Sequence, residues 1–226
     1  MIPEYKRVDL FTDKKDYVYE PFVNIEEYSN GLILVDMHYF FADLPGSTHI
    51  AWVRKTVADM LIQAAKNLPA GFRLKVLDAW RSFETQKAIY DKFLSDVKIE
   101  SPWMDSAEAS VVVQEFVSYP TEKGYLHATG GAVDVTIVDK DGNECNMGAR
   151  FDEFTNRAHT DYYETRLNMR ILWNRRFLYE AMTKAGFVNL PSEWWHYSYG
   201  DVLWAVETNN GVKYRPVLIE EDIENA

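Results

Sequence analysis

The chain has 226 residues, of which 47% are hydrophobic and 26% charged, and its formal net charge is -11. This length and composition are typical of one globular domain, so we expect a single domain over residues 1–226, with residues 1–25 as an N-terminal extension. A strongly acidic surface repels phosphate backbones and anionic lipids, which argues against nucleic-acid and membrane partners. Acidic residues crowd the end of the chain, and we expect a mobile acidic tail over residues 216–226.

The cellular compartment is indicated by three features of the sequence. Cys145 is the only cysteine, so an internal disulfide cannot form. No apolar run reaches the roughly 18 residues that cross a bilayer. The first 20 residues are charged throughout and lack the apolar core of a signal peptide. We therefore expect a cytoplasmic protein.

Hydrophobic periodicity predicts strands and helices along the chain. In the first half, the predicted elements are a strand at 32–36, a helix from a cap at Ser47 or Thr48 to residue 68, a strand at 74–79 and a helix at 82–97. Within the second of these strands, Asp78 is expected on the same face as Leu74 and Val76.

The second half begins with a capping-box pattern at Asp105 and Glu108, which predicts the start of a short helix. The elements predicted after it are a strand at 131–138, a turn at Asp141-Gly142, a helix at 168–184, strands around a bend near Pro191 within 187–199, and a last strand at 202–206. Because strands and helices do not alternate strictly, we expect an α+β fold with a small antiparallel sheet covered by helices.

Two of the five histidines lie in motifs rich in metal-binding side chains. The motifs are Tyr125-Leu-His-Ala-Thr-Gly-Gly-Ala-Val-Asp134 and Glu193-Trp-Trp-His196. His127, Asp134 and His196 together supply two imidazoles and one carboxylate, a donor set that suits a catalytic zinc site with one position open for water. The two glycines between His127 and Asp134 allow the chain to turn sharply between these side chains.

Glu193 and Arg81 are candidates for the chemistry beside the metal. A metal lowers the pKa of bound water towards roughly 7, and a carboxylate such as Glu193 can take its proton. Arg81 follows a predicted strand and carries a permanent charge that suits an oxyanion. Each pattern alone is weak, since Arg81 by itself is more often a solvated strand end. Residues three apart on a regular strand point to opposite faces, so Glu193 and His196 meet only if the backbone bends, as Pro191 permits.

Four stretches of the chain occur together in one known family. They are Leu77-Asp-Ala-Trp-Arg-Ser82, His127-Ala-Thr-Gly-Gly-Ala-Val-Asp134, Met147-Gly-Ala-Arg-Phe-Asp152 and Glu193-Trp-Trp-His-Tyr197. In sequence and order they resemble the bacterial D-alanyl-D-alanine dipeptidases of the VanX type, within the wider group of zinc DD-carboxypeptidases and hedgehog-like domains. The resemblance covers roughly residues 30 to 200.

This resemblance implies a hedgehog/DD-peptidase-like fold and one Zn2+ ion held by His127, Asp134 and His196. It implies that Glu193 is the catalytic base and Arg81 the arginine that stabilises the transition state. It also implies that Asp152 meets the free ammonium group of the substrate, although a helix N-cap is an alternative role for this residue.

The sequence departs from the family at two places, one on each side of His127. Tyr125 stands where these dipeptidases carry Ser, and Ala128-Thr129 stands where they carry Ser-Arg. The ring of Tyr125 occupies far more room than a serine, so we expect Tyr125 to contact the substrate and to change the size and stereochemistry that the pocket accepts. The sequence suggests no role for His159.

The resemblance implies zinc-dependent hydrolysis of D-alanyl-D-alanine, or of a closely related dipeptide, to free amino acids. The partner would be this small dipeptide, and the purpose turnover of cell-wall precursors. One alternative is a zinc DD- or LD-carboxypeptidase that acts on longer peptidoglycan peptides. Another is a non-catalytic zinc-binding domain, against which Glu193 and Arg81 both argue, because structural zinc needs neither.

Overall fold

The structure is a computed structural model that describes residues 1–121, 124–220 and 223. Its strands are β1 (Phe22–Asn24), β2 (Leu34–Val35), β3 (Trp52–Arg54), β4 (Arg73–Asp78), β5 (Ala132–Val138), β6 (Val188–Asn189) and β7 (His196–Ser198). Its α-helices are α1 (Ile25–Tyr28), α2 (His38–Phe41), α3 (Lys55–Asn67), α4 (Phe83–Glu100), α5 (Ser106–Val113), α6 (Met169–Lys184) and α7 (Val202–Thr208), and two short 3-10 helices are η1 (Leu126–Thr129) and η2 (Asn156–Ala158). Within the described ranges, no helix combines the length and the apolar character that crossing a membrane requires.

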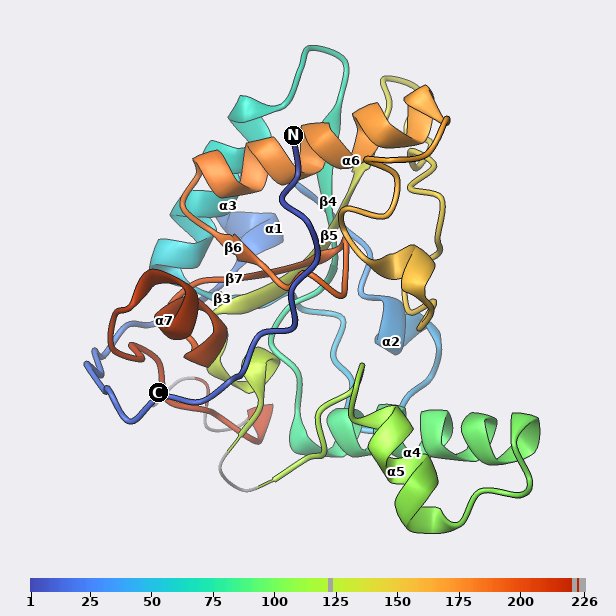
Figure 1. Cartoon of the computed structure of the whole chain (residues 1–226). Helices are drawn as coiled ribbons and strands as arrows, with labels where there is room; N and C mark the ends of the chain where they lie inside the picture. Colours follow the sequence, from blue (N-terminus) through green and yellow to red (C-terminus); the bar gives the residue numbers. More distant parts are fainter. Residues whose placement is uncertain (122–123, 221–222, 224–226) are drawn as a thin grey trace.

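A five-stranded sheet with the order β2-β4-β5-β7-β6 lies at the centre of the molecule (Figure 1). β2 pairs with β4 in parallel, and the remaining pairs in this sheet are antiparallel. β1 and β3 form a separate antiparallel pair. The predicted α+β class is confirmed, and the sheet is antiparallel except at the edge where β2 joins it.

The central strand β5 has a core face and a site face. Val133 and Val135 point into the main hydrophobic core, where they join Leu61 of α3 and Leu178 of α6. Successive side chains on a strand alternate between faces, so Asp134 projects from the opposite face. The two long helices α3 and α6 therefore cover one side of the sheet and leave the other side for the site.

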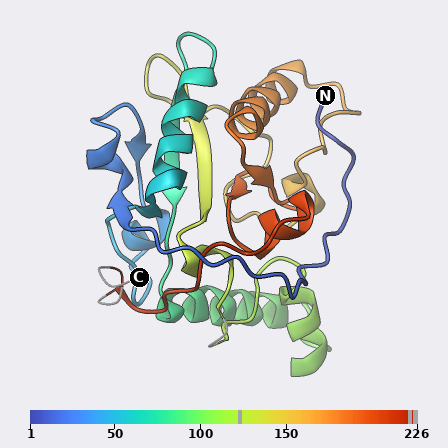
Figure 2. The ribbon, with the colours of Figure 1, turned by 90° about the vertical axis from the view of Figure 1, so that its left-hand side faces the viewer.

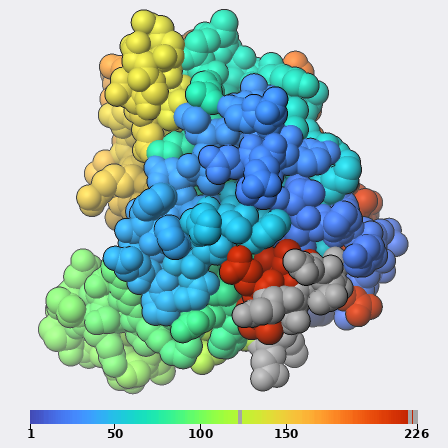
Figure 3. Space-filling model, turned by 180° about the vertical axis from the view of Figure 1, so that it is seen from behind, coloured from blue at the N-terminus to red at the C-terminus, as the bar shows by residue number. Residues whose placement is uncertain are grey.

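Helices α4 and α5 pack on each other below the sheet. Ile89 and Tyr90 of α4 are buried with Ala109 and Val113 of α5 in a second cluster. Figure 2 shows α4 lying across the bottom of the molecule, and in the view from behind the same green segment forms its lower edge (Figure 3). The predicted capping box at the start of α5 is confirmed.

Two predicted elements are wrong because nonlocal or capping interactions determine the local structure. The helix expected from Ser47 or Thr48 begins only at Lys55, since residues 52–54 pair with β1 as a strand. The strand expected at 202–206 is α7. Asp201 caps this helix by accepting a hydrogen bond from Trp204 N at 3.0 Å, which outweighs the strand preference of its β-branched residues.

A register shift in β4 changes the face on which Asp78 lies. Val76 pairs with Val135 on the core face, whereas Asp78 pairs with Asp134 on the site face, and the register shifts between them. The expectation that Asp78 shares a face with Leu74 and Val76 is therefore wrong. A bulge of this kind re-aims a side chain without ending the strand.

The two ends of the chain pack against the body. Trp80 Nε1 donates a hydrogen bond to Val217 O at 2.8 Å, and Val217 and Ile223 are both buried. The start of the expected mobile tail at 216–226 is thus a packed segment, and residues 221–222 and 224–226 lie outside the described residues. The N-terminal extension runs as a long irregular segment across the front of β6 and β7 (Figure 1).

Arg175 of α6 holds the long loop that follows β5. It is almost fully buried. Its guanidinium donates at short distance to three carbonyls of this loop, Met147 O at 2.7 Å, Arg157 O at 2.6 Å and His159 O, and at 3.4 Å to a fourth, Thr160 O. Burial lowers the pKa of Arg175 to about 10, which leaves it charged at neutral pH. This one side chain therefore fixes the loop that carries Asp152.

Replacing Arg175 with Met tests this role. Arg175→Met keeps the length of the side chain but leaves the three carbonyls without a donor, so we expect the free energy of unfolding to fall by about 3 kcal/mol. Urea denaturation followed by tryptophan fluorescence measures the loss. Arg170→Met, at an exposed position of the same helix, should change stability by less than about 0.5 kcal/mol. Equal losses in the two variants would contradict the role of Arg175.

Candidate active site

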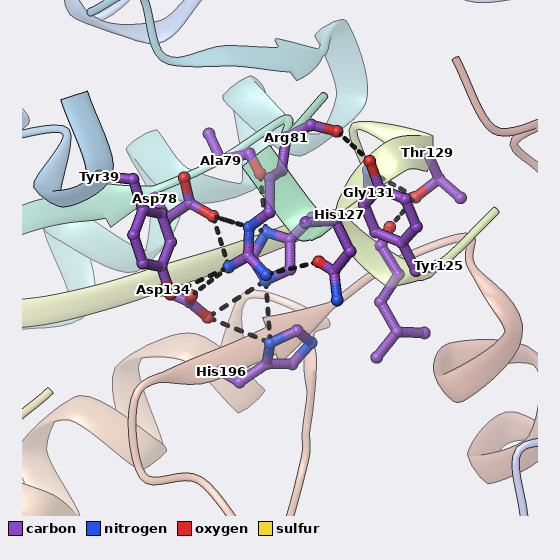
Figure 4. A network of polar contacts seen from close by, with 12 residues as sticks. Tyr39, Asp78, Ala79, Arg81, Tyr125, His127, Thr129, Gly131, Asp134 and His196 are labelled. Atoms are coloured by element: carbon purple, nitrogen blue, oxygen red, sulfur yellow. Dashed lines mark hydrogen bonds and ion pairs between the residues drawn. The ribbon is translucent and has the colours of Figure 1, made fainter. Parts of the chain in front are cut away.

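Three adjacent strands place Asp78, Asp134 and His196 in one row. Asp78 of β4 pairs with Asp134 of β5, and Asp134 pairs with His196 of β7. Directly paired residues of antiparallel strands project from the same face with their Cβ atoms about 5 Å apart. His127 reaches the row from η1, just before β5, so His127, Asp134 and His196 converge on one face of the sheet (Figure 4).

The turn between η1 and β5 requires its two glycines. Gly130 has a φ of 68°, and a Cβ there would lie 2.1 Å from the ring of Phe22. A Cβ on Gly131 would lie 2.3 Å from Tyr199 O. Neither position accommodates a side chain. The sharp turn that the sequence predicts between His127 and Asp134 is confirmed.

His127, Asp134 and His196 form a buried group whose ligand atoms all lie within 4.8 Å of one another. Asp134 Oδ1 lies 3.1 Å from His196 Nδ1 and 3.4 Å from His127 Nε2. His127 Nδ1 lies 2.7 Å from Ala79 O, which can only accept, so Nδ1 carries the hydrogen and Nε2 presents a lone pair. His196 turns its Nε2 towards Ser198 Oγ at 3.2 Å and its Nδ1 towards Asp134.

These residues fit a divalent cation. Asp134 Oδ1 is buried and has no hydrogen-bond donor among the described residues. Burial alone would raise the pKa of Asp134, but the two facing imidazoles hold it well below its usual range, so the carboxylate is charged. His127 Nε2 and His196 Nδ1 lie 3.2 Å apart beside this carboxylate oxygen, and two imidazole nitrogens with one carboxylate oxygen are a donor set that zinc accepts.

Glu193 lies in the loop between β6 and β7, beside the group but not part of it. Its Oε2 is 3.8 Å from His196 Nδ1. Asn189 braces the loop by donating to Glu193 O and to His196 O, both at 3.0 Å. The predicted bend near Pro191 is confirmed. Burial, with the charges of Asp134 and Asp152, raises the pKa of Glu193 well above its ordinary value.

Arg81 is buried and held on several sides. Its Nε donates to Asp78 Oδ2 at 2.9 Å and its Nη1 donates to Gln86 Oε1 at 2.8 Å, while Nη2 lies 3.5 Å from Asp134 Oδ2. Burial would lower the pKa of Arg81, but the facing Tyr39 and carboxylates raise it above its ordinary value. The guanidinium is therefore a fixed positive charge beside the candidate metal ligands.

Asp152 faces the same cavity from the loop that Arg175 holds. Its backbone is left-handed, with a φ of 56°, a conformation that non-glycine residues rarely adopt outside special sites. Tyr39 Oη donates to Asp152 Oδ2 at 2.8 Å. Burial raises the pKa of Asp152 to about 7, despite this hydrogen bond and the charge of Arg81. Asp152 is not a helix N-cap, because residues 153–155 directly after it are not helical and Thr155 caps the next 3-10 helix.

Tyr125 lines the cavity, but its hydroxyl is already occupied. Tyr125 Oη donates to Arg81 O at 2.7 Å, and burial raises the pKa of the phenol above its usual range. Tyr125 therefore supports the backbone of Arg81 and contributes its ring to the wall. The Ser that the family carries at this position could not span that distance.

Sequence reasoning missed several residues that shape the site. They are Tyr39, Asp78, Gln86, Asn189 and Ser198, and each contacts a candidate site residue described above. The contacts of Asp78 and Gln86 with Arg81 could have been predicted from the sequence, because these residues lie only 3 and 5 positions from Arg81. The contact of Tyr39 with Asp152 could not, since 113 residues separate the two.

The site opens into one cavity of about 700 Å3. Its lining includes the metal group, Arg81, Asp152 and Glu193, and also His159, for which the sequence suggested no role. This volume lies within the range of roughly 300–1,000 Å3 that small-molecule sites occupy. Trp195, buried, forms part of its wall.

Metal binding by the group is testable by substitution. We expect the wild-type chain to bind about one zinc ion and to melt at a higher temperature with zinc than after chelation, because a ligand of the folded state stabilises it. Asp134→Ala and His196→Ala should each abolish stoichiometric zinc binding, since each removes one of three ligands. Atomic absorption after gel filtration measures the content. Asp91→Ala, an exposed carboxylate on α4, is the control. Full zinc occupancy in His196→Ala would refute the assignment.

Solved structures and curated proteins of known activity resemble this chain. VanYB in complex with D-Alanine-D-Alanine aligns with a TM-score of 0.48 and 18% identity, over 75% of this chain and 85% of that one. A mutant of the vancomycin resistance D,D-pentapeptidase VanY, in complex with Zn(II), aligns with a TM-score of 0.44 and 17% identity, over 75% and 86% of the two chains. At these values the structures are distant from this chain, and the sequence matches carry the assignment.

The sequence matches name one family. The D-alanyl-D-alanine dipeptidase of Escherichia coli is 30% identical over 168 residues, which are 73% of this chain and 83% of that protein. The D-alanyl-D-alanine dipeptidase of Synechocystis sp. is 39% identical over 92 residues, which span 37% of each protein. Residues 49–213 match the family profile described as D-ala-D-ala dipeptidase. The chain therefore belongs to this family of metallopeptidases.

Proposed function

We propose that this chain hydrolyses D-alanyl-D-alanine, or a closely related dipeptide, to free amino acids, and that it does so in the turnover of cell-wall precursors. The observation that carries the proposal is the convergence of His127 Nε2, Asp134 Oδ1 and His196 Nδ1 in one buried group, beside Glu193, a buried carboxylate outside the group. A structural zinc site uses four protein ligands and closes the metal off, whereas three ligands leave a position for reaction.

Each of the surrounding side chains has a role in this proposal. A zinc ion held by His127, Asp134 and His196 would supply Lewis-acid chemistry at the scissile carbonyl and at water. Glu193 takes a proton from the attacking water and delivers it to the leaving amine as the peptide C–N bond breaks. Arg81, fixed by Asp78 and Gln86, stabilises the negative charge that develops on the carbonyl oxygen.

Asp152 provides the selectivity for a free amino terminus. A dipeptide carries its ammonium group one residue from the scissile bond, and a carboxylate at that distance pairs with it. Tyr39 holds one oxygen of Asp152 and leaves the other for the substrate. The alternative of a carboxypeptidase for longer peptides would have no use for such a carboxylate, because its substrates carry an acylated amine there.

The base is tested by Glu193→Ala. If Glu193 moves protons and does not bind the metal, the variant should keep its zinc and its fold but lose roughly 10²–10⁴-fold in kcat. Release of D-alanine from D-alanyl-D-alanine, measured with zinc content on the same samples, checks both parts. His196→Ala should lose zinc and activity together. A Glu193→Ala protein that keeps wild-type activity, or one that loses its zinc, would sink this role.

The role of Asp152 is tested by blocked substrates and by pH. Asp152→Asn should raise KM for the free dipeptide by about tenfold, since a charge-assisted hydrogen bond is lost. N-acetylated dipeptide and a pentapeptide should be poor substrates of the wild type. Because the pKa of Asp152 is about 7, its carboxyl is neutral below that pH, so kcat/KM of the wild type should fall as pH drops through 7. In Asp152→Asn, the fall of kcat/KM around pH 7 should disappear.

Equal rates on free and acetylated dipeptides would instead favour the carboxypeptidase alternative.

The cytoplasmic compartment is part of the same proposal, since free dipeptides and cell-wall precursors are made there. Fractionation of cells followed by immunodetection tests it, and recovery of the protein outside the cytoplasm would contradict it.

A further inference from the structure

Residues 2–10, which we call the N-terminal strap, are fixed against the loop that follows β5. Ile2 is buried, and its N donates to Glu164 Oε1 at 3.0 Å. Tyr5 N donates to Asp161 Oδ2 at 2.8 Å, and the Tyr5 ring stacks on His159 with centroids 4.1 Å apart. This stacking gives His159 a place in the structure that the sequence did not indicate. The first half of the strap is therefore held in one conformation.

The strap is also held further along the chain. Val8 packs against a buried cluster that includes Leu126, beside the candidate ligand His127, and Leu190 of the loop that carries Glu193 packs on the same cluster. Beyond the strap, Asp16 N donates to Val212 O at 2.9 Å. The segment is thus attached on both sides of residues 6–7, and it crosses the front of the sheet in a fixed path (Figure 1).

Residues 5–10 line the same cavity as the metal group. Two of them, Lys6 and Arg7, are cationic and exposed, and across the described part of the chain neither is held in an ion pair. The other lysine or arginine in the described lining is Arg81, whose charge is balanced by Asp78 at 2.8 Å and Asp134 at 3.5 Å. Lys6 and Arg7 therefore provide the uncommitted positive charge of this cavity.

A free dipeptide brings two charges into the cavity. In the proposed function its ammonium group pairs with Asp152. Its carboxylate must then lie in a cavity that also contains Asp134 and Glu193, and an anion there requires a cationic partner. Tyr125 does not supply a hydrogen-bond donor for this carboxylate either, because its hydroxyl already donates to Arg81 O.

We propose that the N-terminal strap recognises the C-terminal carboxylate of the substrate through Lys6 and Arg7. This inference rests on the proposed function. The family match covers residues 49–213, so the strap lies outside it, and the strap adds a specificity-determining wall to a site whose candidate metal ligands lie within the match. The chain has a net charge of -11, so two cations at this mouth also draw an anionic group towards an otherwise repulsive surface.

The test compares two substrates that differ only in this charge. Kinetics are measured on D-alanyl-D-alanine and on its C-terminal amide with the double variant Lys6→Gln/Arg7→Gln. KM for the free acid should rise by about tenfold, as expected for two partly exposed charge pairs, with kcat nearly unchanged. KM for the amide should stay at its wild-type value. Arg7→Lys with Lys6 intact keeps both charges and should behave like the wild type.

Lys15→Gln is the matched control, because Lys15 lies on the same N-terminal segment but outside the cavity lining. Zinc content and melting temperature of every variant should equal those of the wild type. An equal rise in KM for acid and amide would overturn the inference and make the strap a steric wall only, and an unchanged KM for the acid would overturn it as well. Failure of the proposed function looks different, because the wild type itself would then cleave neither substrate.

Discussion

A single buried carboxylate, Asp134, constrains the whole site. It lies on the central strand β5, all of whose residues are buried, and its Oδ1 has no donor among the described residues. A charge in such a place is costly unless a cation compensates it. Arg81 Nη2 lies 3.5 Å from Asp134 Oδ2, and the imidazoles of His127 and His196 face Asp134 Oδ1. The fold therefore gathers two imidazole nitrogens and one carboxylate oxygen in a geometry that suits a divalent cation.

The surrounding structure keeps these donors in place. The glycines at 130 and 131 let η1 return into β5, and the strand pairing fixes the distance between Asp134 and His196. Carbonyl and hydroxyl groups orient the two imidazoles, and Asn189 braces the loop that carries Glu193. Residues that hold ligands or their neighbours in this way are as necessary to a metal site as the ligands themselves.

The parts of the fold that follow from local sequence were predictable. The helices at 83–100 and 169–184 and the capping box at 105–108 depend on residues three or four positions apart, and the structure has them. The parts that depend on distant partners were not. Residues 52–54 form a strand because they pair with 22–24, and the face of Asp78 is set by a register shift against β5. Neither the pairing nor the register shift can be predicted from the residues next to it in the sequence.

The candidate site shows the same division between local and distant signals. The metal group was predictable because its chemistry is concentrated in two short motifs. The contact of Tyr39 with Asp152 and that of Tyr5 with His159 join residues more than a hundred positions apart, and no spacing rule reaches that far. Tyr125 lines the cavity, and its hydroxyl donates to Arg81 O, a contact that the sequence did not indicate, while its contact with the substrate stays a prediction.

The path of the N-terminal strap has a consequence for biosynthesis. The strap is synthesised well before its partners, because Ile2 contacts Glu164 across 162 positions and, farther along the N-terminal segment, Lys14 contacts Val212. Contacts of such long sequence separation form late in folding, after the loops between them have closed. Residue 196 completes the metal group only slightly earlier in synthesis. A nascent chain therefore cannot hold a finished catalytic pocket until His196 and the partners of the N-terminal segment have been synthesised.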